Sequence, residues 1–372
     1  MDGAHQHTST RIVAIDVAKA LACLAMIQTH AYDAWVSPLA KMTSAYGVTR
    51  VIGTLPLPAF LLLSGMSFAT RIHTASIRNE AVAPLRIALL KRGGMIILAG
   101  YALSFAYAAL DGWPGWNTVL RADVLHVIGL SMVTAAVLGL RTARTGHGPD
   151  ETALQRRVAV LGFMVALLCP WLTRFTYDSA THLGPFRFAV APFLDVHGIT
   201  RMPLVPLFAW FALGVLLRFA FVRRTLRPTK EATAVATTGF YLSCLLGGLV
   251  VALAFAKVTS LTLDRFPGTF SRTHVVVWPN LLDLSARAVA LLGVAGLVAA
   301  SLPPRVLSIV RTVGEHSLFI YAVHIPFCYG IAGKPLQHAL TMPQATASVA
   351  ALMVACVVAS LAKQAFESRK AV

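Results

Sequence analysis

The sequence predicts an all-α, polytopic membrane protein with about ten transmembrane helices. Of its 372 residues, 57% are hydrophobic and 13% are charged, whereas a soluble domain has about 25% charged residues. Apolar stretches long enough to cross the hydrocarbon core recur along the whole chain. The sequence shows no internal repeat and no second domain. We therefore expect a single transmembrane domain over residues 1–372.

Each apolar stretch is interpreted as one helix. The first holds Asp16 and Lys19 and lacks a small-residue cleavage site after it, so we expect a retained helix rather than a signal peptide. The second contains Pro56 and Pro58, which loosen its outer turn. The third begins directly after Arg92, and length and hydropathy define the other seven. In chain order, the predicted helices are 12–34, 52–70, 93–110, 123–140, 158–173, 204–222, 234–256, 286–302, 313–333 and 345–363.

Lysines and arginines gather in every second connection, which predicts the orientation. The positive-inside rule assigns these connections to the cytoplasm. Both termini are then cytoplasmic, and the first helix runs outward. The net charge of +17 therefore reflects topology, so we expect the lipid bilayer and no nucleic acid as a partner. A bacterial inner or plasma membrane is the expected location. These basic residues are Arg71, Arg78, Arg86, Lys91, Arg92, Arg141, Arg144, Arg156, Arg157, Arg223, Arg224, Arg227, Lys230, Arg305 and Arg311.

The cysteines indicate neither an external disulfide nor a metal site. All five lie within apolar stretches, where cysteine acts as a small buried hydrophobic residue. No CxxC pair and no Cys/His spacing typical of zinc occurs. We therefore expect no bound metal and no permanently bound cofactor.

The first predicted helix carries a line of polar side chains. Lys19 and His30 are eleven positions apart, so an ideal helix separates them by about 20° around its axis and roughly 16 Å along it. Asp16 lies one turn before Lys19, and Asp33 lies on the same face beyond His30. An ionisable side chain inside a membrane is a functional candidate by default. We expect Lys19 in the inner half and His30 near the outer surface, both facing one protein-lined cavity.

A second group of ionisable residues lies at the outer start of the fourth predicted helix, in RADVLHVIGL. Asp123 and His126 are three positions apart and share a face, at the depth assigned to His30. A neutral histidine oriented by a carboxylate is the arrangement that a general base requires. The alternative is that Arg121 and Asp123 lie at the membrane interface without a catalytic role.

Two further helices and the cytoplasmic side supply candidate binding residues. The ninth predicted helix carries Tyr321 and His324 on a polar stripe, which either lines a cavity or bonds a neighbouring helix. Ser64 lies in a small-residue run that permits close helix packing, or it faces a ligand. Arg71 and Arg92 are expected at cytoplasmic helix ends, where guanidinium groups can bind acidic phosphates.

Together these segments resemble a known family. Lys19-x10-His30 is similar to the Arg/Lys-x10-His signature of the membrane acyltransferases of family three. The surrounding IDVAKALACLAMIQTHAYD resembles more closely the related heparan-alpha-glucosaminide N-acetyltransferase-type proteins of bacteria. The stretches PAFLLLSGMSFATR, DVLHVIGLSM, MPLVPLFAWFALGVLL and GEHSLFIYAVHIPF then follow in the family's order.

The resemblance implies an enzyme that moves an acyl group, expected to be acetyl, from cytoplasmic acyl-CoA to a hydroxyl or amine of a cell-envelope glycan at the outer face. It implies that His30 is the catalytic base or a transient acyl carrier. It also places Lys19 near the donor, where the family more often has arginine. The catalytic candidates are His30, Lys19, Asp123 and His126, and the binding candidates are Asp16, Asp33, Ser64, Arg71, Arg92, Tyr321 and His324.

Two other functions stay open at the level of sequence. A proton-coupled secondary transporter would use the same intramembrane ionisable residues as a relay, although transporters usually show paired repeats, which are not found here. The number of these residues argues against a membrane scaffold without activity.

Overall fold

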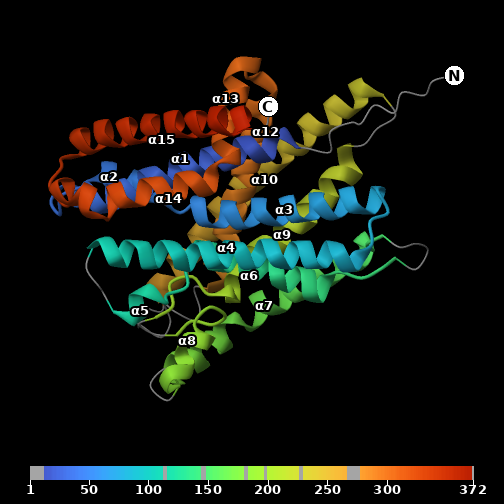
Figure 1. Ribbon diagram of the computed structural model, residues 1–372, viewed down its shortest axis with the longest axis horizontal. Coiled ribbons are helices and arrows are strands. Elements are labelled where there is room, and N and C mark those ends of the chain that lie inside the picture. Colours follow the sequence, from blue (N-terminus) through green and yellow to red (C-terminus); the bar gives the residue numbers. More distant parts are fainter. Residues whose placement is uncertain are drawn as a thin grey trace.

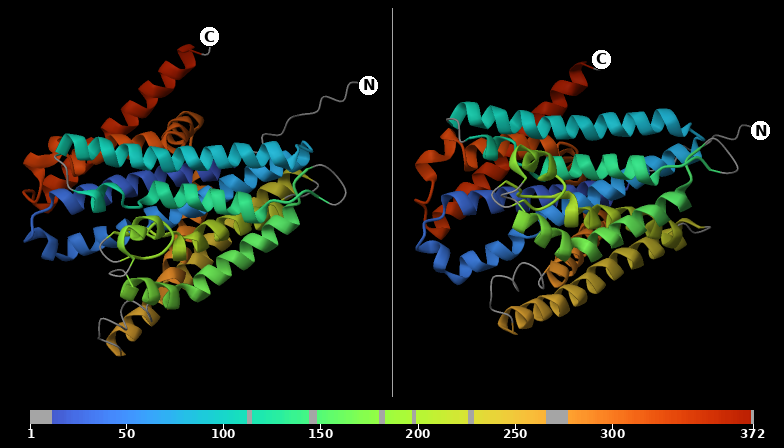
Figure 2. Two further views of the ribbon diagram at one scale, coloured as in Figure 1. Left: turned by 60° about the horizontal axis from the view of Figure 1, so that its bottom comes forward. Right: turned by 90° about the horizontal axis from the view of Figure 1, so that it is seen from below.

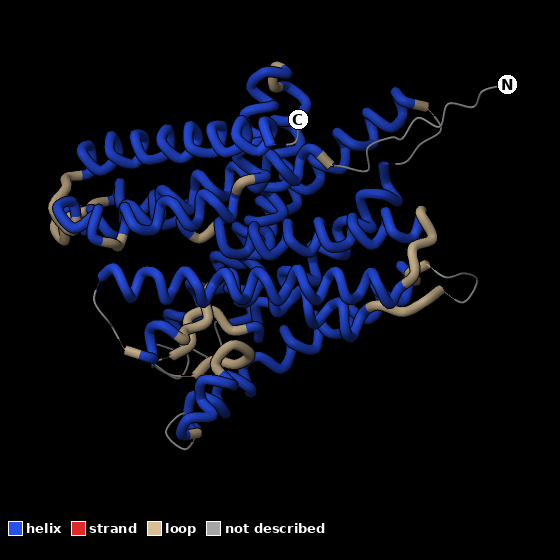
Figure 3. The backbone as a smooth tube through the Cα atoms, viewed as in Figure 1, coloured by secondary structure: helices blue, strands red, loops and turns tan. Residues whose placement is uncertain are grey.

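The computed structural model describes residues 12–111, 115–143, 148–179, 183–196, 199–225, 229–265 and 277–370. Figure 3 shows helices joined by short loops, and no strand is formed in these ranges. Eight of the described helices are long and apolar enough to cross a membrane, and a bent pair gives a ninth span if it is counted as one. The predicted all-α polytopic membrane fold is thereby confirmed.

The long helices lie mostly side by side along one direction (Figure 1). They coincide with the predicted apolar stretches, and several extend well beyond them. The helices are α1 (Val13–Trp35), α2 (Ser44–Gly53), α3 (Pro56–Ile77), α4 (Val82–Asp111), α5 (Trp116–Val119), α6 (Val124–Thr134), α7 (Glu151–Ser179), α8 (Arg187–Val190), α9 (Leu204–Thr225), α10 (Lys230–Arg265), α12 (Val277–Ser301), α13 (Pro304–Glu315), α14 (Ser317–Cys328) and α15 (Met342–Lys370). Short 3₁₀ or π turns are η1 (Ala40–Met42), η2 (Ala135–Gly139), η3 (Gly184–Phe186) and η4 (Ile331–Leu336).

Helix α1 lies inside the bundle, where it contacts α3, α12, α13, α14 and α15. Its apolar side chains belong to two buried clusters. One includes residues of α3, α10 and α12, and the other includes residues of α14 and α15. A helix that is apolar around most of its circumference belongs in such a buried position. The polar side chains of α1 consequently meet other helices of the protein.

Helices α3 and α9 approach each other so closely that only glycine fits at two positions. A Cβ atom added at Gly65 would lie 2.0 Å from the Phe211 carbonyl oxygen, and one added at Gly214 would lie 1.9 Å from the Leu62 carbonyl oxygen. Small residues permit this approach between membrane helices. The close packing predicted for the run around Ser64 is therefore confirmed, and it fixes α3 as one wall of the site described below.

The ninth predicted helix, 313–333, is broken rather than continuous. Helix α13 ends at Glu315, α14 begins at Ser317, and the two helices are bent by 72°. Gly314 lies against α1, where an added Cβ would be 2.1 Å from the Asp16 carbonyl oxygen. Glycine also weakens a helix by its backbone freedom. The prediction of one helix was wrong because the contact with α1 cannot be read from hydropathy.

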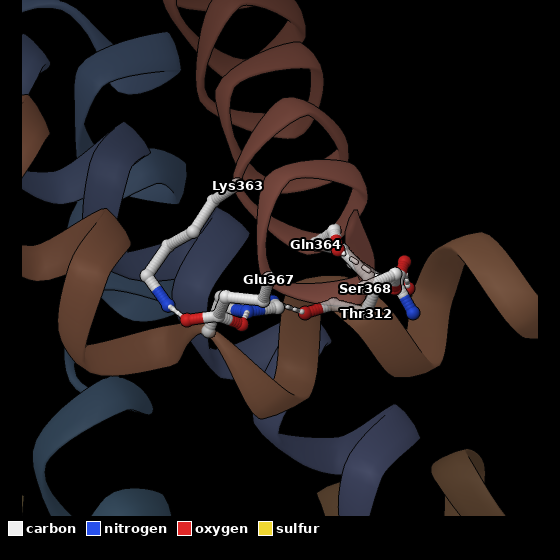
Figure 4. Close-up of polar contacts among 6 residues, drawn as sticks. Thr312, Lys363, Gln364, Glu367 and Ser368 are labelled. Carbon is white, nitrogen blue, oxygen red and sulfur yellow. Dashed lines mark hydrogen bonds and ion pairs between the residues drawn. The ribbon is translucent and has the colours of Figure 1, made fainter. Parts of the chain in front are cut away.

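Polar contacts tie this bend to α15. The Thr312 hydroxyl donates to Gln364 Oε1 at 2.7 Å, and Lys363 forms an ion pair with Glu367 (Figure 4). His316 Nε2, at the break itself, lies 3.2 Å from a Glu367 carboxylate oxygen. Helix α14 therefore starts from an anchored point, whereas the last turns of α15 extend beyond the bundle (Figure 2).

Helices at the outside of the bundle expose apolar side chains, as contact with lipid requires. Examples are Met95 and Leu98 on α4, Phe163 and Trp171 on α7, Leu246 and Val250 on α10, and Val354 and Val358 on α15.

Candidate active site

A cavity of about 480 Å³ lies at the end of the bundle where α1 ends, which is the predicted outer side. Its walls come from α1, α3, α4, α5, α6 and α14, and from the segments just before α6 and α9. A cavity of this size suits a small-molecule ligand. Apolar side chains such as Met26, Phe60 and Leu103 form part of the lining. The polar lining residues are His30, Asp33, Ser104, Tyr107, Thr118, Arg121, Asp123, Arg201, Tyr321 and Tyr329.

His30 lines this cavity and is paired with a second histidine. Its Nδ1 atom lies 2.8 Å from Nε2 of His324, which comes from α14, 294 positions away in the sequence. The two rings are nearly coplanar, with an interplanar angle of 5°. His324 is completely buried, and its own Nδ1 lies 2.8 Å from the Ile320 carbonyl oxygen.

This chain of contacts determines which nitrogen of each neutral ring carries the proton. A carbonyl oxygen only accepts, so Nδ1 of His324 must be the protonated atom and its Nε2 must be an acceptor. Nδ1 of His30 then donates to that Nε2. The lone pair of His30 is therefore on Nε2, the nitrogen that a general base would use.

Two carboxylates of the cavity are held by tyrosines. The Tyr321 hydroxyl donates to Asp123 Oδ2 at 3.2 Å, and the Tyr329 hydroxyl donates to Asp33 Oδ2 at 3.1 Å. The ring of Tyr329 also packs edge-on against His30. The structure therefore brings four of the predicted residues together: His30, Asp33, Asp123 and Tyr321, with His324 directly behind His30.

His126 does not have the geometry predicted for it. Its Nδ1 accepts the backbone N–H of Asp123 at 3.0 Å, and the Asp123 carboxylate accepts from the Val124 N–H at 2.7 Å. This reciprocal pair caps the start of α6. The His126 ring is buried against Tyr101 and does not line the cavity. The prediction of a base oriented by the Asp123 carboxylate was wrong, because the same spacing of three also produces a helix cap.

Lys19 and His30 do not share the cavity. Lys19 Nζ donates to the Ser67 hydroxyl of α3 at 3.1 Å, and Lys19 is not among the lining residues. Asp16 is buried beside the close contact with Gly314. The shared helical face of Lys19 and His30 is retained, but α3 and α14 cover different parts of it. The expectation of one cavity for both residues is corrected accordingly.

Three other candidates also differ from their predicted positions. Ser64 does not line the cavity. Arg71 lies within α3 rather than at its end, and it forms an ion pair with Glu80 at 2.6 Å. Arg92 is an exposed residue in the interior of α4, because that helix begins at Val82 instead of at 93. Both arginines were predicted at helix ends because the helices extend into the charged residues that flank the apolar stretches.

Several lining residues were not assigned a role from the sequence. Tyr107 of α4 lines the cavity and donates its hydroxyl to the Ala322 carbonyl at 2.9 Å. Tyr329 follows α14, and Arg201 precedes α9. Arg201 lies just before a predicted helix, a position shared by many residues that merely contact the interface. Tyr107 and Tyr329 lie inside predicted helices, where a polar side chain more often bonds a neighbouring helix.

The comparison of the sequence with protein-family models gave one match, the acyltransferase family 3 domain, over residues 12–362. The comparison with curated protein sequences gave no match. The family match spans all the helices that build the cavity, including α1 with His30 and α14 with His324. The chain belongs to acyltransferase family 3.

Proposed function

We propose that this protein transfers an acetyl group from cytoplasmic acyl-CoA to a hydroxyl or amine of a cell-envelope glycan at the outer face of a bacterial inner membrane. We also propose that it is similar in type to the related heparan-alpha-glucosaminide N-acetyltransferases, on the resemblance of its first helix. Both termini are then cytoplasmic, as the distribution of lysine and arginine indicates.

The observation that carries the proposal is the His30 imidazole, which lines the outer cavity with its Nδ1 bonded to His324. In the proposed reaction the acceptor oxygen or nitrogen attacks the thioester carbonyl carbon, and its proton passes to His30 Nε2. The new C–O or C–N bond forms as the C–S bond breaks. The leaving thiolate of CoA then takes the proton from the imidazolium, which returns His30 to its neutral form.

The donor side is proposed to include Lys19, Arg71 and Arg92. Lys19 lies deeper along α1 than His30, and its Nζ donates to the Ser67 hydroxyl. A lysine ammonium would act on the acyl-CoA as a point charge. Arg92 is exposed on α4, where it is free to meet the CoA phosphates. Arg71 would have to leave Glu80 to do the same.

Purified protein in detergent tests the proposal directly. With acetyl-CoA and a mixture of soluble amino, neutral and acidic sugars, we expect CoA thiol to be released in step with acetylated sugar. A thiol reagent can follow the release because all five cysteines of the protein are buried. Proton-coupled uptake into vesicles without thioester consumption would contradict the proposal.

A further inference from the structure

Two guanidinium groups line the cavity and bond to no carboxylate among the described residues. Arg121 precedes α6 and is half-buried, and Arg201 precedes α9 and is exposed at the cavity mouth. Neither guanidinium group forms a hydrogen bond or an ion pair within the described part of the chain. Burial lowers the pKa of Arg121, the positive charge of Arg201 lowers it further, and Asp123 acts in the opposite direction. Arginine still remains charged.

The two carboxylates of the same cavity do not neutralise these arginines by direct contact. Asp33 accepts from the Tyr329 hydroxyl, and Asp123 accepts from the Tyr321 hydroxyl and from a backbone N–H. Each carboxylate is therefore hydrogen-bonded to a tyrosine hydroxyl rather than to a guanidinium group. The donors of the guanidinium groups stay available to a ligand in this cavity, which two arginines and two aspartates line.

We propose that the acceptor is anionic: Arg121 and Arg201 bind a carboxylate or phosphate group on the sugar while its neighbouring hydroxyl or amine meets His30. The inference rests on the proposed function and narrows its acceptor class to acidic glycans. Guanidinium groups match both anions with paired hydrogen bonds. A neutral sugar would leave the donors of both guanidinium groups without an anionic acceptor, since the carboxylates of Asp33 and Asp123 are bound to tyrosines.

The first test compares acceptors of matched shape on the purified full-length protein with acetyl-CoA. The acceptors are methyl β-glucuronide, which has a carboxylate, methyl β-glucoside, which is neutral, and glucose 6-phosphate. We expect a KM about 10- to 100-fold lower for the anionic acceptors. The better of the two anionic sugars identifies carboxylate or phosphate as the natural group.

Two variants assign the preference to the arginines. Arg201→Gln and Arg121→Gln should each remove most of the preference for anionic over neutral acceptors. Neither should change the KM for acetyl-CoA. Arg201 is exposed, so its variant should fold. Arg50→Gln is the matched control, since Arg50 is an exposed arginine of α2 at the same end of the bundle and does not line the cavity. It should behave as the wild type.

Equal use of the glucoside and the glucuronide would overturn the inference. So would variants that slow transfer to all three acceptors alike, because the arginines would then act on the reaction itself. Binding is tested separately by calorimetric titration of methyl β-glucuronide into His30→Ala protein, with and without Arg201→Gln. Binding that needs Arg201 supports the inference even if no transfer is found, in which case only the proposed function fails. No binding would refute the inference.

Discussion

Replacing His324 by leucine removes the acceptor that holds the Nδ1 proton of His30. The substitution removes the part-buried hydrogen bond of 2.8 Å to His30, together with the bond from His324 to the Ile320 carbonyl. The bond to His30 contributes about 0.5–1.5 kcal/mol net. Because 1.36 kcal/mol corresponds to tenfold in rate, we expect kcat to fall about 2- to 12-fold. The KM for acetyl-CoA should stay unchanged, since His324 is completely buried and does not line the cavity.

His324→Gln separates this positioning role from simple packing. A glutamine amide oxygen can replace Nε2 as the acceptor, so kcat should recover most of the loss seen with leucine. Release of CoA thiol gives kcat and KM, and thermal unfolding in detergent shows whether both variants fold equally well. Two results would refute the reasoning: a wild-type kcat for His324→Leu, or equal kcat values for two well-folded variants.

Three other predictions follow from the described contacts. The transfer rate should fall as pH is lowered far enough to protonate His30, since only the neutral imidazole accepts a proton; a rate–pH profile without an acid limb would contradict this. Lys19→Ala should raise the KM for acetyl-CoA more than it lowers kcat, and the reverse result in steady-state kinetics would remove Lys19 from the donor side. Gly214→Ala should lower the melting temperature in detergent, because its Cβ would lie 1.9 Å from the Leu62 carbonyl oxygen. Gly247→Ala should leave the melting temperature unchanged, because its Cβ would meet nothing within 4 Å. An equal fall in melting temperature for both variants would argue against close α3–α9 packing.

Hydropathy was sufficient to locate the membrane helices but not where they end. The third apolar stretch was predicted to begin at 93, whereas α4 begins at Val82. The first turns of such a helix carry charged residues that lie beyond the hydrocarbon core. The apolar stretch therefore begins several residues after the helix does. This difference misplaced Arg92 relative to its helix end. The break at His316 was missed for another reason, because it accompanies the close contact of Gly314 with α1.

The residues of the site were predictable one at a time, but their partners were not. Periodicity along one helix placed Lys19 and His30 on a common face, and that reasoning needs no tertiary structure. The pairing of His30 with His324 joins residues 294 positions apart. It depends on which helices are neighbours. The same missing information explains why Asp123 and His126 were interpreted as a catalytic pair instead of a helix cap.

The single-turnover rate of acetyl transfer in purified His30→Ala protein tests the central claim most directly. If His30 Nε2 is the base, the rate should fall about 10²- to 10⁴-fold, while calorimetric binding of CoA stays at the wild-type value. His338→Asn is the matched control: His338 is exposed, lies outside the cavity and has a positive φ of 55°, which asparagine tolerates. It should transfer at the wild-type rate. A wild-type rate in His30→Ala itself would contradict the mechanism and the assignment of the site.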